Sequence, residues 1–163
     1  MRYIKLLLIF ILTILLSGCI INDPKYINFK SKPNDYYYSN EIYSKVKKNE
    51  IFKLQVFDAD LYKYYDVADA DYDIILNFFS ALKSKNYLTE LNSEDKPPYE
   101  LIITFNDAKY VINVYSNTEA SVYPWDGCFK EDIVDMTGVC NHDNLYYFCQ
   151  YVIEESQKQS ASQ

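Results

Sequence analysis

Hydrophobic and polar residues alternate in several short stretches of the chain, the pattern of half-buried strands. One stretch covers residues 51–57, where every second position is apolar. Residues 99–123 repeat the same period in three runs, with a turn signal at Asn106-Asp107. We therefore expect one strand at about 51–57 and a three-strand antiparallel meander at about 99–123.

Three other segments carry apolar residues at the 3.6-residue period of a helix, at about 34–48, 69–85 and 143–156. In the second segment the stripe consists of Tyr72, Ile75, Leu76, Phe79 and Leu82. In the last segment it consists of Leu145, Phe148, Cys149 and Val152. Two or three helices beside an antiparallel meander predict an α+β fold.

The N-terminus has the pattern of an export signal. Two basic residues precede an apolar run that extends from Leu6 to Leu16, too short for a bilayer span, which needs about 20 residues. The run ends in Leu16-Ser17-Gly18-Cys19, which resembles the lipobox of bacterial lipoproteins. The resemblance implies cleavage before Cys19, a lipid on its thiol, and a location on the outer face of the cell membrane. The alternative is an ordinary secretory signal with a chance cysteine.

These signals divide the chain into four parts. Residues 1–18 are the expected signal peptide, and residues 19–33 are the lipidated cysteine and a polar tether with two prolines. Residues 34–157 have the length and apolar content of a single folded domain. Residues 158–163 are expected to form a loose tail.

Charge is unevenly distributed along the chain, and its acidic excess argues against nucleic acid as a partner. The net charge is −7, and residues after position 50 hold eight Lys against nineteen acids. Arg2 is the only arginine and would be removed with the signal. Since arginine forks and basic surfaces are the usual means of contacting phosphates and bases, we expect no nucleic-acid binding.

An acidic run between residues 58 and 73 is the one candidate for a metal site. Its candidate ligands are Asp58, Asp60, Asp69, Asp71 and Asp73. Asp69 to Asp73 resembles the opening of a calcium loop, but Ile74 and Ser80 stand where an EF-hand requires Gly and Glu. Acids that favour the positive end of a helix explain the run better, so no metal site is predicted.

Three cysteines and one histidine remain in the body. Cys128, Cys140 and Cys149 form either one disulfide with a spare thiol or three reduced thiols. Cys128 and Cys140 are the candidate pair, because both fall in an irregular segment. His142 could pair with a thiol for nucleophilic catalysis, but helix capping also explains its position. With only Gly127 and Gly138 in the body, no Gly-rich loop exists and no cofactor is predicted.

The stretch from Tyr123 to Cys128, Tyr-Pro-Trp-Asp-Gly-Cys, contains the only tryptophan. Pro124 should end the strand and Asp126-Gly127 should turn the chain. We expect Trp125 to fold back and seal the core. The alternative is that Trp125 stands out as a contact for a partner.

These features together resemble small clostridial lipoproteins of unknown molecular function. The shared features are the lipobox, a body rich in Tyr, Asn and Lys, the Tyr-Pro-Trp-Asp-Gly stretch and a last helix that carries a cysteine. The resemblance implies no activity. The sequence favours a non-catalytic binding or interaction module, tethered to the membrane, with a protein or a cell-wall ligand as partner. The alternative is an enzyme or an inhibitor that acts on cell-wall or peptide substrates.

Overall fold

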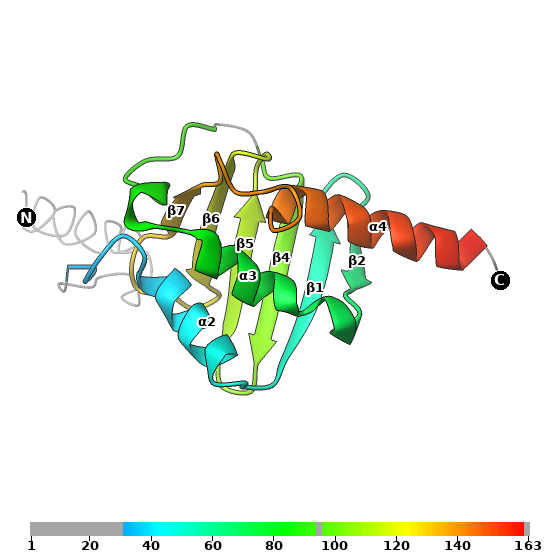
Figure 1. Cartoon of the computed structure of the whole chain (residues 1–163), viewed down its shortest axis with the longest axis horizontal. Coiled ribbons are helices and arrows are strands. Elements are labelled where there is room, and N and C mark those ends of the chain that lie inside the picture. The colour runs from blue at the N-terminus through cyan, green and yellow to red at the C-terminus, as the bar shows by residue number, and fades with distance from the viewer. Residues whose placement is uncertain (1–30, 94–95, 162–163) are drawn as a thin grey trace, which may run out of the picture. The chain divides into compact units, whose positions relative to one another are not determined.

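An antiparallel sheet of seven strands forms the centre of the domain (Figure 1). The computed structural model describes residues 31–93 and 96–161, so the signal peptide, Cys19 and most of the tether lie outside the described residues. Residues from Lys32 onward form one compact unit. The strands are β1 (Phe52–Asp58), β2 (Lys63–Asp66), β3 (Tyr87–Leu88), β4 (Tyr99–Phe105), β5 (Lys109–Val114), β6 (Glu119–Pro124) and β7 (Asp132–Asp135). Their order across the sheet is β2-β1-β4-β5-β6-β7-β3.

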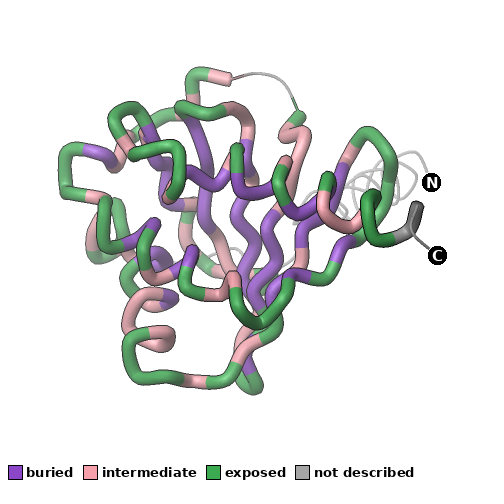
Figure 2. Tube along the Cα trace, turned by 45° about the vertical axis from the view of Figure 1, so that its right-hand side comes forward, coloured by how far each residue is buried: buried purple, intermediate pink, exposed green. Residues whose placement is uncertain are grey.

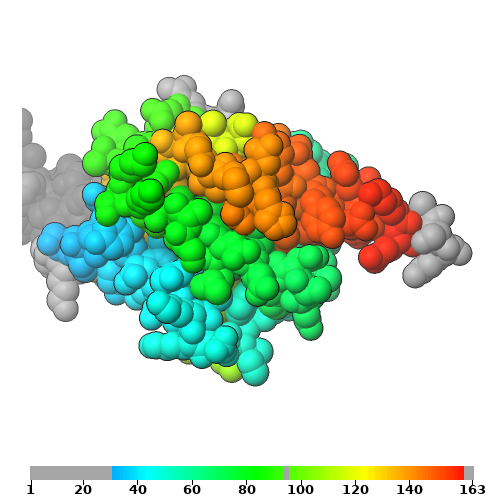
Figure 3. All heavy atoms as spheres, in the orientation of Figure 1, coloured from blue at the N-terminus to red at the C-terminus, as the bar shows by residue number. Residues whose placement is uncertain are grey.

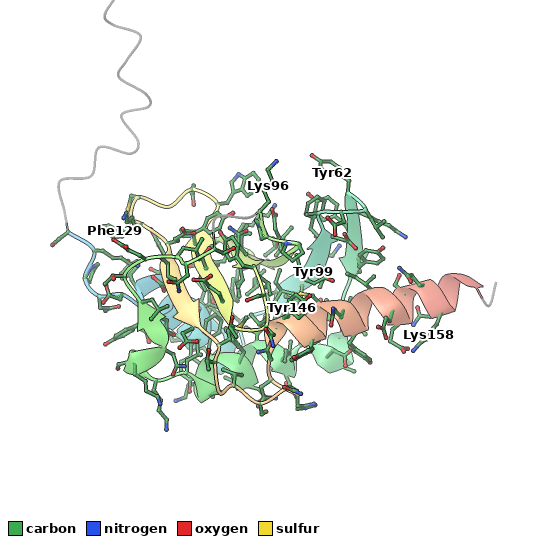
Figure 4. The ribbon with its side chains drawn as sticks, turned by 90° about the horizontal axis from the view of Figure 1, so that it is seen from above. Tyr62, Lys96, Tyr99, Phe129, Tyr146 and Lys158 are labelled. Atoms are coloured by element: carbon green, nitrogen blue, oxygen red, sulfur yellow. The ribbon has the colours of Figure 1, made fainter. Side chains whose placement is uncertain are left out.

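Three α-helices pack on one face of this sheet. They are α2 (Tyr37–Lys47), α3 (Asp73–Ala81) and α4 (Leu145–Ala161), and short 3-10 turns η3 (Asp69–Asp71) and η4 (Ser84–Asn86) flank α3. Figure 1 shows the helices in front of the strands, and the view from above in Figure 4 shows α3 and α4 on one side of the sheet. The α+β fold, its meander and its three helices are as the sequence predicted.

The core lies between the helices and the sheet. Alternate residues of β1, β4 and β5 point toward the helices, and buried positions run along the central strands in Figure 2. Core residues with almost no exposed surface include Leu54, Leu101, Ile103, Ile112, Ile75 and Phe78. The predicted inward face of the meander is therefore confirmed.

The second predicted helix is shorter than expected and buries a different stripe. Its buried residues are Ile74, Ile75, Phe78 and Phe79, whereas Tyr72, Leu76 and Leu82 are only half-buried. The α-helix begins at Asp73 and ends at Ala81, because 3-10 turns or extended backbone replace its predicted ends. The helix is four residues shorter at each end, and Ile75 and Phe78 are its most deeply buried residues.

Three further elements differ from the expectation. The strands β3 and β7 were not predicted, because they have two and four residues and show too little alternation to identify them. The last helix starts at Leu145 and extends to Ala161, so part of the predicted loose tail at 158–163 is helical. Its predicted stripe is confirmed, since Leu145, Phe148, Cys149 and Val152 are all buried.

Candidate functional site

A hollow of about 550 Å³ lies between the start of α3 and the start of α4. Figure 3 looks onto this side of the domain, where the loop before α4 lies against α3. The lining residues are Ala70, Asp71, Asp73, Ile74 and Asn77 from the α3 side, and Asn141, His142, Tyr147, Phe148 and Tyr151 from the α4 side. We call this hollow the α3–α4 groove. Its volume falls in the range of about 300–1,000 Å³ that small-molecule sites occupy.

The groove has an apolar floor and a polar rim. Ile74 and Phe148 are buried core residues, and each contributes one side of the floor. Around them stand Asp73, Asn77 and His142, which are exposed to solvent. Such a surface can bind the carbon skeleton of a ligand below and its polar groups above.

Local structure fixes the α4 wall. The Asn144 side chain accepts the N–H of Tyr146 at 3.0 Å, and its amide donates to the Asn117 carbonyl at 2.8 Å. The Asn117 amide in turn donates to the Tyr147 hydroxyl at 3.1 Å. Tyr147 and Tyr151 are four residues apart, which places both rings on the same side of the helix. This wall therefore presents two aromatic rings, one of which is held by a hydrogen bond.

The start of α4 is also packed against the sheet. The rings of Tyr146 and Tyr99 lie 5.5 Å apart between centroids, and Figure 4 shows the two side chains together near the start of the helix. Because Tyr99 belongs to β4, this contact anchors the α4 wall of the groove to the centre of the sheet.

The acidic run is divided among different places. Asp58 is buried and its carboxylate accepts the N–H groups of Asp60 and Leu61, both at 2.9 Å, so it shapes the turn between β1 and β2. Only Asp71 and Asp73 line the groove. Within residues 31–93 and 96–161, no three His, Cys, Asp or Glu side chains are grouped as a metal would require. The expectation that the run forms no metal site is not tested by this arrangement and stays a prediction.

The body thiols do not form the predicted disulfide. Cys128 and Cys140 are free and exposed, and Cys149 is free and buried. The loops that hold Cys128 and Cys140 leave opposite ends of β7, whose four residues span about 13 Å at about 3.3 Å per residue. A disulfide requires Cα atoms within about 7 Å, and neither thiol is bonded in this structure.

Among the described residues, no thiol forms a hydrogen bond with His142. The Cys140 thiol donates to the Asp143 carboxylate at 3.0 Å. Burial raises the pKa of the Cys149 thiol far above its ordinary value, so this thiol stays protonated and unreactive. His142 lines the groove and has no hydrogen-bond partner among the described residues.

Trp125 does not seal the core, and that expectation was wrong. The Trp125 side chain is 67% exposed, and the Lys109 ammonium lies 4.4 Å from its ring centroid. The backbone N–H of Trp125 donates to the Lys109 carbonyl at 2.8 Å. The strand β6 ends at Pro124, as predicted, although Pro124 still pairs with Tyr110 of β5. The contact with Lys109, which alternates in β5 with the core residue Tyr110, places Trp125 on the face of the sheet opposite the helices. Contact with a partner stays a prediction for this residue.

A buried ion pair that the sequence did not reveal joins the start of the domain to β7. The Asp132 side chain is 0% exposed, and its carboxylate lies 2.6 Å from the Lys32 ammonium and accepts the Ser39 N–H at 2.7 Å. Ser39 lies in the first turn of α2, which has no cap of its own, so Asp132 caps α2 from a distant strand. Burial raises the pKa of Asp132, although Lys32 and the Ser39 N–H oppose that shift.

Comparison with known proteins identifies the family. The model of a domain of unknown function, DUF4883, matches residues 32–149. The chain belongs to this family. The DUF4883 match begins at Lys32, the partner of Asp132, and contains every groove residue except Tyr151. Both the ion pair and most of the groove are therefore parts of the family domain.

A solved structure is similar to this DUF4883 protein. It is a crystal structure of a Clostridium perfringens protein whose name describes it as a lipoprotein candidate. It is 30% identical in sequence, superposes with a TM-score of 0.69, and covers 76% of this chain and 99% of its own. Among curated proteins, none matches the chain. In the part of the chain that the structure describes, no helix is long and apolar enough to cross a membrane.

Proposed function

We propose that this DUF4883 protein is a lipid-anchored binding protein on the outer face of the cell membrane. The anchor would be Cys19, at the end of the sequence Leu16-Ser17-Gly18-Cys19. The name of the Clostridium perfringens neighbour supports this address. A cysteine with two or more acyl chains would hold the protein stably, whereas a single chain gives only marginal binding.

The observation that carries the binding role is the α3–α4 groove. It combines a buried apolar floor with exposed amide, carboxylate and imidazole groups that form no side-chain hydrogen bond or ion pair among the described residues. Polar side chains that serve the fold are usually hydrogen-bonded. Those of the groove rim are available to a small polar ligand.

The pKa shifts of the acids support a binding role better than a catalytic role. A catalytic acid commonly has a carboxyl whose pKa burial raises within a cleft. Here burial raises the pKa of Asp132 and of Glu100, and neither lines the groove. Asp132 is committed to Lys32 and α2. We therefore favour a binding protein over an enzyme acting on cell-wall or peptide substrates.

Membrane fractionation tests the anchor. Wild-type protein should remain with the membranes, and Cys19→Ala should either keep its signal peptide or leave the membrane fraction. Conversion of Cys128 to Ala is the matched control, since Cys128 is an exposed thiol of the body. If Cys19→Ala fractionates and migrates as wild type does, the anchor proposal is wrong.

Blocking the groove tests the binding role. Ala70 lines the groove and Ala68 does not, yet both are exposed residues of one short segment. A low-molecular-mass extract of the producing cell's envelope should raise the thermal midpoint of the mature protein in detergent micelles by several degrees. Ala70→Trp should abolish this rise, and Ala68→Trp should retain it. An extract that stabilises neither wild type nor Ala68→Trp would count against a binding role.

A further inference from the structure

Within the described part of the chain, the two carboxylates of the groove have no cation partner, unlike the five acids of this domain that pair with lysines. Asp71 and Asp73 form no ion pair among the described residues. Elsewhere, lysines pair with acids at 2.6–3.1 Å: the acids are Asp132, Glu50, Asp107, Asp66 and Glu155. No Lys lines the groove, and the mature chain would have no Arg. The groove therefore offers negative charge with no compensating cation.

The aromatic rings of the groove are likewise free of cations. Five lysine ammonium groups lie over rings elsewhere, at 4.4–5.7 Å from the centroids. None of those rings is Tyr147 or Tyr151. An ammonium group is attracted to such a ring face, and the attraction grows when the site is partly dry. Both groove tyrosines thus have faces available to a cation from outside.

The other groove residues favour an organic cation over a metal ion. A metal ion such as calcium takes six to eight oxygen ligands, and the groove provides two carboxylates and no third acid beside them. The buried floor of Ile74 and Phe148 would gain from contact with carbon atoms. An ion with an apolar skeleton matches both the charge and the floor.

We propose that the α3–α4 groove binds a small organic cation, an amine or a quaternary ammonium compound. The cation would sit between the carboxylates of Asp71 and Asp73 on one wall and the rings of Tyr147 and Tyr151 on the other. Its carbon skeleton would cover Ile74 and Phe148. This inference rests on the proposed binding function and names the class of its ligand.

A matched pair of probes tests the charge requirement. One probe is choline, and the other is its uncharged carbon analogue, in which a tert-butyl group replaces the trimethylammonium group. Each is titrated by calorimetry into the mature protein in neutral detergent micelles. We expect choline to bind at least tenfold more tightly than the analogue, and more weakly as salt is added.

Variants locate the site. Asp71→Asn combined with Asp73→Asn should weaken choline binding at least tenfold, with little effect on the analogue. Tyr151→Leu should weaken it about threefold, which corresponds to an exposed cation–π contact. Asp69→Asn is the matched control, since Asp69 is an exposed acid of the same segment outside the groove, and it should change the affinity less than twofold. Thermal unfolding of each variant verifies that it is folded.

Several outcomes would overturn the inference. They are no choline binding, equal affinity for both probes, saturable binding of glucose instead, or choline binding that survives both the double Asn variant and Ala70→Trp. If the envelope extract still stabilises wild type but not Ala70→Trp, the groove binds a ligand of another class and only this inference fails. If the extract has no effect either, the proposed function fails as well.

Discussion

Two regions of the helix-covered side use polar groups in opposite ways. At the α2–β7 junction, Asp132 is fully buried and is bound by the Lys32 ammonium and the Ser39 N–H. At the α3–α4 groove, Asp73 and His142 are exposed and have no partner among the described side chains. Polar groups of the first kind position the chain, whereas those of the second kind are free for an external ligand. Substitutions should therefore affect stability at the junction and binding at the groove.

The largest effect on stability should follow from breaking the buried ion pair. Lys32→Met leaves the Asp132 carboxylate buried without its cation, a change that costs about 3–5 kcal/mol. Urea unfolding of the soluble chain from residue 20 onward measures this loss. Lys53→Met is the matched control, because Lys53 and its partner Asp66 are both exposed, and it should cost less than about 1 kcal/mol.

The same variant has a pH signature. Burial raises the pKa of Asp132 above its unfolded value, so its contribution to stability is greatest when it is protonated and falls as the pH rises through the folded pKa. The deficit of Lys32→Met relative to wild type should therefore shrink toward acid pH. A deficit that is constant from neutral to acid pH would argue against a charge effect.

Alkaline pH should weaken the domain next most strongly. Burial raises the pKa of Tyr87 to about 12 and also raises that of Tyr110, whose hydroxyl donates to Glu41 of α2. Unfolded tyrosines ionise near 10, so the stability contributed by both is complete below that pH and is lost as the pH rises through the folded pKa. Each group should remove up to about 1.4 kcal/mol per pH unit. Urea unfolding at several alkaline pH values, with Tyr87→Phe as the comparison, tests this expectation.

A smaller loss should follow from removing one hydroxyl near the junction. The Tyr38 hydroxyl donates to the Phe129 carbonyl at 3.3 Å and accepts the Phe129 N–H at 2.9 Å, so it holds the loop after β6. Tyr38→Phe should cost about 1–2 kcal/mol of unfolding free energy.

The exposed Trp125 at the start of that loop should emit at long wavelength and be readily quenched by iodide in the wild type. Blue-shifted, protected emission would contradict its position in the structure.

The smallest effect on stability should come from the groove itself. Asp73→Asn removes an exposed acid from the first turn of α3, where it interacts favourably with the helix dipole, and should cost less than about 1 kcal/mol. Asp73→Asn should reduce the affinity for the ligand far more than it reduces the stability of the domain. A loss as large as that of Lys32→Met would mean that the groove acids serve the fold, and would remove the contrast between the two regions.

Local patterning was sufficient to predict the sheet centre and the last helix. In β4 and β5 the alternation of apolar residues reflects one covered face, and in α4 the buried stripe includes Cys149 as predicted. Such patterns depend on neighbours within a few positions of each other. They fail where the element is as short as β7, or where a 3-10 turn replaces an expected helix end, as at Asp69.

The site residues were harder to predict because they meet from distant parts of the chain. Ser39 and Asp132 are 93 positions apart, and the groove joins residues near 70 with residues near 145. The acidic run and His142 were each recognised from the sequence, but nothing in either segment indicated that they face one another. Trp125 was misplaced because the sequence did not indicate to which side of the sheet the chain turns after β6 ends at Pro124.

The ends of the sheet have a consequence for the proposed anchoring to a membrane. An unpaired edge strand can recruit the backbone of a neighbouring molecule and start aggregation. Here one edge, β3, has two residues, and the other, β2, has four and carries exposed Lys63 and Asp66. Short, charged edges give an incoming strand few hydrogen bonds and an unfavourable desolvation. Copies held close together by a common anchor plane would therefore stay separate, and each groove would remain accessible.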